Sequence, residues 1–237
     1  MAYFKLDPCK YDFASDSIDI IVLVYDYSGS MEGDASAMKK ANKAFYDSFS
    51  KFEEKASVAI SKARFNSGFD MTPFDVVDKF DVSYYASGGT ALYSAIVEAG
   101  KNTISYYNEI IKRLNVIPKI TFLVFSDGDD NESGSYYSSA KEIVTQLNSL
   151  DATTVFVAFR DAIKSGIGDD LKFSCTKDIH SVQELVNCMG NELSKSCKEQ
   201  SKSAYSLKSE FFSKADENAA EDDAKNQAII DDDFFDI

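Results

Sequence analysis

The sequence predicts an α/β fold: a doubly wound, mostly parallel sheet with one antiparallel edge strand and helices on both faces. Short, almost continuously apolar segments at 18–25, 119–126 and 153–159 are typical of strands buried on both faces. The segments between them place apolar residues three and four apart, the period of an amphipathic helix. Polar, glycine-rich clusters follow two of these strands, where such sheets place their ligands.

The elements can be assigned in chain order from these periods. Strands are predicted at 18–25, 56–63, 75–82, 119–126 and 153–159. Helices are predicted from the N-cap Asp34 to 52, from 90 to 114, and from 182 to 197. Another helix, which ends at 147, is predicted to follow a polar loop at 127–135. A hairpin around 66–73 makes the second and third strands antiparallel, and 171–174 is a candidate edge strand.

Charge and composition exclude several classes of partner. The 237 residues carry 39 acidic and 25 basic side chains, a net charge of −14, so nucleic acid is not expected as a partner. No basic run exists to hold an anionic membrane, and no apolar segment is long enough to span a bilayer. The N-terminal residues lack the apolar core of a signal peptide, and the four cysteines are scattered. We therefore expect a cytoplasmic protein with reduced thiols.

The composition divides the chain into an extension at 1–16, the α/β domain at 17–200, a helical extension at 201–213 and an acidic tail at 214–237. The tail has nine Asp or Glu residues and two Lys, hence a net charge of −7. Phe234, Phe235 and Ile237 lie among its acidic residues, which resembles the apolar-tipped acidic tails through which bacterial single-stranded-DNA-binding proteins recruit partners. The tail is predicted to be solvated, to dock in a basic, apolar-lined pocket of a partner, or to form a helix at 219–230 that packs back on the body or on a neighbour.

Three polar clusters supply candidate ligands for a cation. They are Asp26-Tyr27-Ser28-Gly29-Ser30, Ser87-Gly88-Gly89-Thr90 and Asp127-Gly128-Asp129. Carboxylate and hydroxyl oxygens suit Mg²⁺, while the absence of His and Cys from the set argues against zinc and copper. Glycine lets the backbone approach a bound group closely.

These clusters resemble the metal-ion-dependent adhesion site of von Willebrand factor type A domains, which have a Rossmann-like fold. The family's D-x-S-x-S motif, distant Thr and distant Asp match Asp26, Ser28, Ser30, Thr90 and Asp127. The resemblance implies that the hydroxyls contact Mg²⁺ directly, and that the two carboxylates act largely through water or by orienting other ligands. Mn²⁺ and Ca²⁺ are alternatives.

The resemblance further implies a non-enzymatic interaction module whose open coordination position accepts a Glu or Asp of a protein partner. Asp129, Asp130 and Gly89 are the expected rim of that contact. The chain looks like small cytosolic stand-alone members, loosely TerY-like, for which an AAA+ ATPase or a stress-response protein is an expected partner. It lacks the zinc-binding cysteine pairs that TerY-like proteins often carry, and its oligomeric state is not predicted.

Four other interpretations are weaker. Each of the five residues alone could be an ordinary cap or turn residue, but five matches in three separate segments favour a shared site. A phosphatase would need a second Asp where Ser28 stands, and the calcium-loop pattern that begins at Asp127 lacks its glycine and its final Glu. A scaffold that acts mainly through the acidic tail remains the principal alternative.

Overall fold

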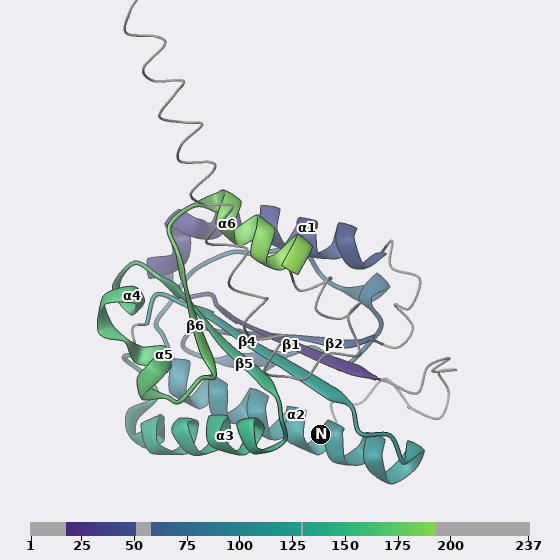
Figure 1. The fold of residues 1–237 in the computed structure, drawn as a ribbon. Helices are drawn as coiled ribbons and strands as arrows, with labels where there is room; N and C mark the ends of the chain where they lie inside the picture. The colour runs from purple at the N-terminus through teal and green to yellow at the C-terminus, as the bar shows by residue number, and fades with distance from the viewer. Residues whose placement is uncertain (1–17, 51–57, 129, 193–237) are drawn as a thin grey trace, which may run out of the picture.

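A computed structural model describes residues 18–50, 58–128 and 130–192. It contains a six-stranded sheet in the order β3-β2-β1-β4-β5-β6, which confirms the predicted fold class (Figure 1). The strands are β1 (Asp19–Asp26), β2 (Val58–Phe65), β3 (Phe69–Met71), β4 (Lys119–Ser126), β5 (Thr153–Phe159) and β6 (Cys175–Ile179). Among these six described strands, only the edge strand β3 is antiparallel to its neighbour. The predicted extension at 1–16, helical extension at 201–213 and acidic tail lie outside the described residues.

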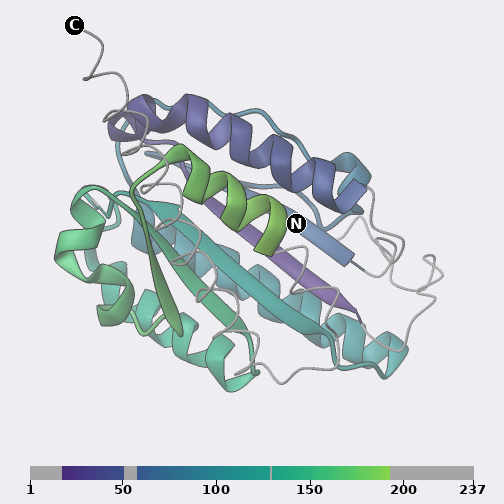
Figure 2. The ribbon, with the colours of Figure 1, turned by 45° about the horizontal axis from the view of Figure 1, so that its top comes forward.

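Helices cover both faces of the sheet (Figures 1 and 2). One face carries α1 (Ala35–Ser50) and α6 (Val182–Asn187), and the other carries α2 (Leu92–Leu114) and α3 (Tyr137–Ser149). The short helices α4 (Asp161–Ser165) and α5 (Ile167–Asp170) follow β5. Turns of 3-10 helix occupy Gly29–Asp34, Val77–Lys79 and Gly134–Tyr136, and a π-helical turn, Cys188–Glu192, follows α6.

The central strand β1 shows why the apolar runs become strands. All eight of its residues are buried, and successive side chains point to opposite faces of the sheet. Ile20 and Val22 therefore join the core beneath α2 and α3, while Ile21 and Leu23 join the core beneath α1 and α6. A segment that must fill two cores has no polar positions to spare, which explains its nearly continuous apolar sequence.

The predicted strand at 75–82 is wrong. Only Asp75 pairs with the sheet, through an isolated bridge to Ile60, and a 3-10 turn follows at Val77. Phe74 packs in the core under α2, whereas Val77 packs in the core under α1. The chain therefore wraps around the edge of the sheet at this point, and the antiparallel edge strand is instead the short β3.

Two smaller predictions are also corrected. The edge strand lies at β6 rather than at 171–174, because Lys172 has a φ of 68° and interrupts any extended segment there. Asp34 directly precedes α1, as expected of an N-cap, but its carboxylate forms an ion pair with Arg160. None of the helices in the described part of the chain combines the length and hydropathy needed to cross a membrane.

A buried carboxylate at the start of β1 gives a testable pH dependence. Asp19 is 6% exposed, its Oδ2 has no hydrogen-bond partner among the described residues, and burial raises its pKa to about 6 against the opposing charge of Lys119. A raised pKa means that the folded state binds more protons than the unfolded state between about pH 4 and 6. The free energy of unfolding should therefore fall as the pH rises through this window.

We expect Asp19→Asn to remove this contribution and to raise the free energy of unfolding at pH 8 by about 1–3 kcal/mol. Urea denaturation of both proteins at pH 4 and pH 8 measures it. Asp26 titrates in the same window, so the informative quantity is the difference between the two proteins at each pH. A difference that does not grow from pH 4 to pH 8 would contradict the prediction.

Candidate metal centre

The carboxylate of Asp26, at the end of β1, is fixed from both sides. It is fully buried, its Oδ1 accepts a hydrogen bond from the backbone N–H of Ser28 at 2.8 Å, and its Oδ2 accepts one from the hydroxyl of Ser126 at 2.6 Å. Burial raises the pKa of Asp26 to about 6, although these hydrogen bonds oppose the rise and the nearby Asp127 adds to it. Asp26 is thus a positioned buried acid that joins the ends of β1 and β4.

The two serines of the first loop lie side by side. Ser28 Oγ and Ser30 Oγ are 3.0 Å apart, with Ser28 buried and Ser30 exposed. Ser28 precedes the 3-10 turn at Gly29–Asp34, but its side chain makes no capping hydrogen bond. A simple capping role therefore does not account for Ser28, and the contact between the two hydroxyls leaves each oxygen with a further lone pair for a ligand.

The second loop lies against the first. Gly29 N–H donates to the carbonyl of Gly88 at 3.0 Å, and the positive φ of Gly88, 85°, shapes this contact. Thr90 is buried, yet the N-cap of α2 is Ala91, and the first-turn N–H groups of Tyr93 and Ser94 donate to the side chains of Asp130 and Ser133. The Thr90 hydroxyl is therefore not used as a helix cap.

The third loop clamps the second. The side-chain oxygen of Asn131 accepts from Thr90 N–H at 2.9 Å, and Asn131 N–H donates to the Thr90 carbonyl at 3.0 Å. This pair of bonds fixes the backbone of Thr90 relative to the loop that follows β4. Because β1 and β4 are neighbouring parallel strands, the three polar clusters meet at one edge of the sheet.

Asp127 supplies the observation that most favours a cation. It is 5% exposed, and its Oδ1 is buried without a hydrogen-bond partner in the described structure. The other carboxylate oxygen, Oδ2, lies 3.9 Å from Nη1 of Arg160. A buried carboxylate oxygen is costly unless a donor or a metal ion satisfies it. The residues present therefore fit a hard divalent cation, with two carboxylates and three hydroxyls as candidate ligands.

The candidate ligands include only two residues, Asp26 and Asp127, of the types that most often bind metals in proteins (His, Cys, Asp and Glu). Within the described ranges, no cluster of three or more His, Cys, Asp or Glu side chains is placed to hold an ion. The candidate site instead relies on Ser and Thr hydroxyls beside two acids. This composition suits Mg²⁺ better than a soft transition metal.

Sequence reasoning missed two residues of the site. Ser126 was assigned only to its strand, yet its hydroxyl donates to Asp26 and accepts from Gly128 N–H at 3.0 Å. Arg160 follows β5 with a φ of 45°, and its guanidinium donates to the carbonyl of Ser30 at 2.6 Å and pairs with Asp34. Nothing local distinguished either residue, because both act on groups about 100 or more positions away.

The expected rim is only partly described, since Asp129 lies outside the described residues. The carboxylate of Asp130 accepts from the backbone N–H groups of Tyr93 at 2.8 Å and Ser133 at 2.9 Å. Gly89 packs so closely on Glu132 that a Cβ there would lie 2.0 Å from its Oε1. Asp130 thus ties its own loop to α2, and Gly89 allows the second and third loops to touch. Their role in partner binding stays a prediction.

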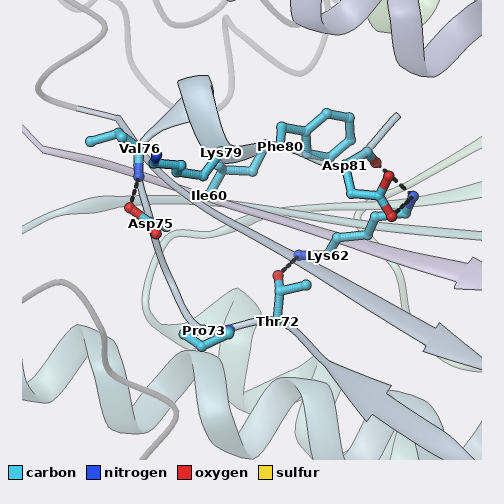
Figure 3. A pocket seen from close by; sticks show the side chains of 9 residues that line it. All are labelled: Ile60, Lys62, Thr72, Pro73, Asp75, Val76, Lys79, Phe80 and Asp81. Atoms are coloured by element: carbon cyan, nitrogen blue, oxygen red, sulfur yellow. Dashed lines mark hydrogen bonds and ion pairs between the residues drawn. The ribbon is translucent and has the colours of Figure 1, made fainter. Parts of the chain in front are cut away.

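A cavity of about 420 Å³ on the flank of the sheet is separate from this site (Figure 3). It lies beside Ile60, five residues before the end of β2, and Lys62 borders it. The Lys62 ammonium donates to the carbonyls of Asp81 at 2.8 Å and Ser83 at 2.5 Å and lies 5.4 Å from the ring centre of Tyr25. Burial lowers the pKa of Lys62 to about 8. These contacts anchor the chain that leads to the second loop.

A scan against protein-family models and a search of curated proteins gave no match. Solved structures do match. They include the pilus adhesin SpaC from Lactobacillus rhamnosus GG, with 14% identity and a TM-score of 0.58 over 76% of this chain. Proximal thread matrix protein 1 from the mussel byssus has 15% identity and a TM-score of 0.53 over 76% of the chain. One structure of that protein has a zinc-occupied metal-ion-dependent adhesion site.

The chain spans 30% of the adhesin and 46% of the byssus protein. It covers 95% of the von Willebrand factor domain of Mfa5, a pilus tip protein from Porphyromonas gingivalis, with 9% identity and a TM-score of 0.53 over 76% of this chain. Such low identities show the fold alone. Together with the sheet order and the single antiparallel edge strand, they show that the chain has the fold of von Willebrand factor type A domains.

Proposed function

We propose that this domain is a non-enzymatic protein-interaction module that binds Mg²⁺ and captures an Asp or Glu side chain of a partner protein. The observation that carries the proposal is the buried Oδ1 of Asp127, which has no hydrogen-bond partner among the described residues, on one of the three loops that also carry Ser28, Ser30 and Thr90. The large majority of buried side-chain oxygens in proteins have a hydrogen-bond donor, and a bound ion is one explanation for an exception. A protein neighbour with a metal-occupied site of the same kind adds support.

The residues of the chain explain why the partner's group would be a carboxylate. Asp26 and Asp127 balance the charge of one divalent ion, and the hydroxyls of Ser28, Ser30 and Thr90 are neutral ligands. A bound Mg²⁺ would supply a positive centre with a coordination position left for an incoming oxygen. Ser126 holds Asp26, and Asn131 holds Thr90, so the ligands are positioned before any partner arrives.

The zinc in the byssus protein belongs to that protein. For this chain we propose Mg²⁺, with Mn²⁺ or Ca²⁺ as alternatives, because its candidate ligands are all hard oxygens. The three structures named above are pilus and byssus proteins, which lend no support to a cytoplasmic location, a stress-response role or an AAA+ ATPase partner. Those three points stay predictions.

The test uses Thr90, whose hydroxyl is not needed to cap α2. Thr90→Val keeps the shape of the side chain without the hydroxyl, and Thr90→Ser keeps the hydroxyl. We expect Thr90→Val to weaken Mg²⁺ binding at least about 10-fold in calorimetry, while Thr90→Ser stays within a few-fold of the unsubstituted protein. Circular dichroism should show all three proteins folded.

Partner binding is tested with the same proteins and Asp26→Ala. A partner retained from cell extract in Mg²⁺ should be lost in EDTA and lost with Asp26→Ala, whereas the exposed control Asp47→Ala should retain it. Two results would overturn the proposal. One is a protein that binds no divalent cation, and the other is a partner held equally well in EDTA.

A further inference from the structure

A shallow cavity of about 290 Å³ opens beside the candidate metal centre. Its lining includes Tyr27, Arg64, Asn66, Phe69, Asp70 and Tyr85. It combines aromatic rings with one guanidinium, and nothing in the proposed cation chemistry uses it. Its position and lining determine which kind of group it can accept.

The same chain segments border both the cavity and the metal centre. Tyr27 lies between Asp26 and Ser28, and its carbonyl accepts from Ser87 N–H at 2.6 Å. The side-chain amide of Asn66 donates to the Ser87 carbonyl at 3.1 Å. A residue that enters the cavity therefore lies next to whatever occupies the metal centre.

The lining favours an aromatic side chain. Tyr85 is 58% exposed, which is unusual for so large a ring, and its ring centre lies 5.0 Å from that of Tyr27 in an edge arrangement. Phe69 contributes another ring. Arg64 pairs with Asp70 and is 29% exposed, so it can also face an acidic neighbour of the bound ring.

One segment of this chain has the matching order of groups. Residues 231–236 read Asp-Asp-Asp-Phe-Phe-Asp, which places carboxylates directly beside aromatic rings. Successive residues of an extended chain are about 3.3 Å apart, a step that joins adjacent subsites. We propose that this segment binds its own domain: an Asp carboxylate enters the metal centre, and Phe234 or Phe235 enters the Tyr27–Tyr85 cavity. This inference rests on the proposed function.

The length of the chain permits this contact. The described residues end at Glu192, in a turn that packs on α1, where Gly190 lies against Ala44. Residues 193–230 supply 38 positions, which would span about 57 Å even as a continuous helix at 1.5 Å per residue. A strand of eight residues spans only about 26 Å. Residues 231–236 can therefore reach the end of the sheet where the candidate metal centre lies, whichever end of the strands the connecting segment starts from.

The charge around the site makes the contact conditional on the metal. Five acidic residues lie at the three loops: Asp26, Asp34, Asp127, Asp130 and Glu132. Arg160 pairs with Asp34 and lies near Asp127, and Arg64, which lines the cavity, is already paired with Asp70. A segment with four carboxylates is repelled by this surface until a divalent cation neutralises it. Once bound, the segment occupies the position that a partner's carboxylate needs, so an external partner must displace it.

The chain contains no tryptophan, which allows a single reporter. Full-length Tyr85→Trp places it at the mouth of the cavity. We expect Mg²⁺ to change its emission, EDTA to reverse the change, and the effect to be independent of protein concentration. In the matched protein that also carries Phe234→Ser and Phe235→Ser, calorimetry should show Mg²⁺ binding, but the emission should stay constant.

A synthetic peptide of residues 229–237, capped at both ends, provides the second measurement. In Mg²⁺ it should bind the Phe234→Ser, Phe235→Ser protein at least about 10-fold more tightly than the protein with the intact segment, because the attached segment competes. Equal affinities, or an unchanged emission response without the two Phe residues, would overturn the inference while leaving the proposed function intact. A response that grows with protein concentration would assign the segment to a second copy and overturn binding within one chain. Failure of Mg²⁺ to bind either protein would overturn both proposals.

Discussion

Asp127→Asn is expected to abolish Mg²⁺ binding while leaving the metal-free domain at least as stable as the unsubstituted protein. Asp127 provides one of the two negative charges in the candidate ligand set. Losing that charge should weaken Mg²⁺ binding by at least about 100-fold, which corresponds to about 2.7 kcal/mol. A site that was only a hydrogen-bonded loop would show no such loss.

The stability effect has the opposite sign for a physical reason. Asp127 is 5% exposed, and its Oδ1 has no hydrogen-bond partner among the described residues. A buried charge without a partner destabilises the fold, and Asn has nearly the same shape without the charge. The substitution also removes the attraction of Arg160, but at 3.9 Å and with Arg160 45% exposed this contribution is small.

Thermal unfolding with and without Mg²⁺ measures both effects. Ligand binding raises the midpoint of the unsubstituted protein, because only the folded state binds the ion. Asp127→Asn should lose that rise but keep or exceed the metal-free midpoint. The exposed neighbour Asp161, which pairs with Lys164, gives the control Asp161→Asn, whose response to Mg²⁺ should be unchanged. An equal Mg²⁺ response in Asp127→Asn would exclude Asp127 as a ligand or charge partner.

Part of the candidate site could be predicted because its residues form short motifs that lie next to apolar segments of the sequence. The D-x-S-x-S motif, Thr90 and Asp127 each follow or precede an apolar segment, so the topology alone brings them together. Ser126 and Arg160 could not be found in this way. Ser126 lies 100 positions from the carboxylate that it contacts, and Arg160 lies 126 positions from Asp34. Their roles depend on which strands become neighbours and on the exact ends of those strands.

The strands of the sheet also divide into those that the sequence predicts and those that it does not. The central strands were predicted because burial on both faces requires continuous apolar sequence, and β1, β4 and β5 satisfy that requirement. The edge was mispredicted because β3 has three residues and contains the charged Asp70. An edge strand is stabilised by one neighbour only, so its sequence carries little of the pattern that marks a central strand.

Gly128→Ala is expected to damage the fold and the metal centre together. Gly128 has a φ of 91°, and a Cβ there would lie 2.9 Å from the Cα of Ala162 in α4. The backbone strain costs about 1–2 kcal/mol and the overlap with fixed backbone about 1–3 kcal/mol. We therefore expect the free energy of unfolding to fall by about 2–5 kcal/mol, measured by urea denaturation.

Gly134→Ala separates the two causes of that loss. Gly134 also has a positive φ, 57°, but a Cβ there would meet no atom within 4 Å, so its substitution should cost only about 1 kcal/mol. Gly128 N–H also donates to Ser126, which in turn donates to Asp26. Displacing Gly128 should therefore weaken Mg²⁺ binding in protein that is still folded, whereas Gly134→Ala should not. Equal losses of stability in the two variants would mean that α4 yields easily, and the end of β4 would then be too compliant to hold Asp26 in place for a cation.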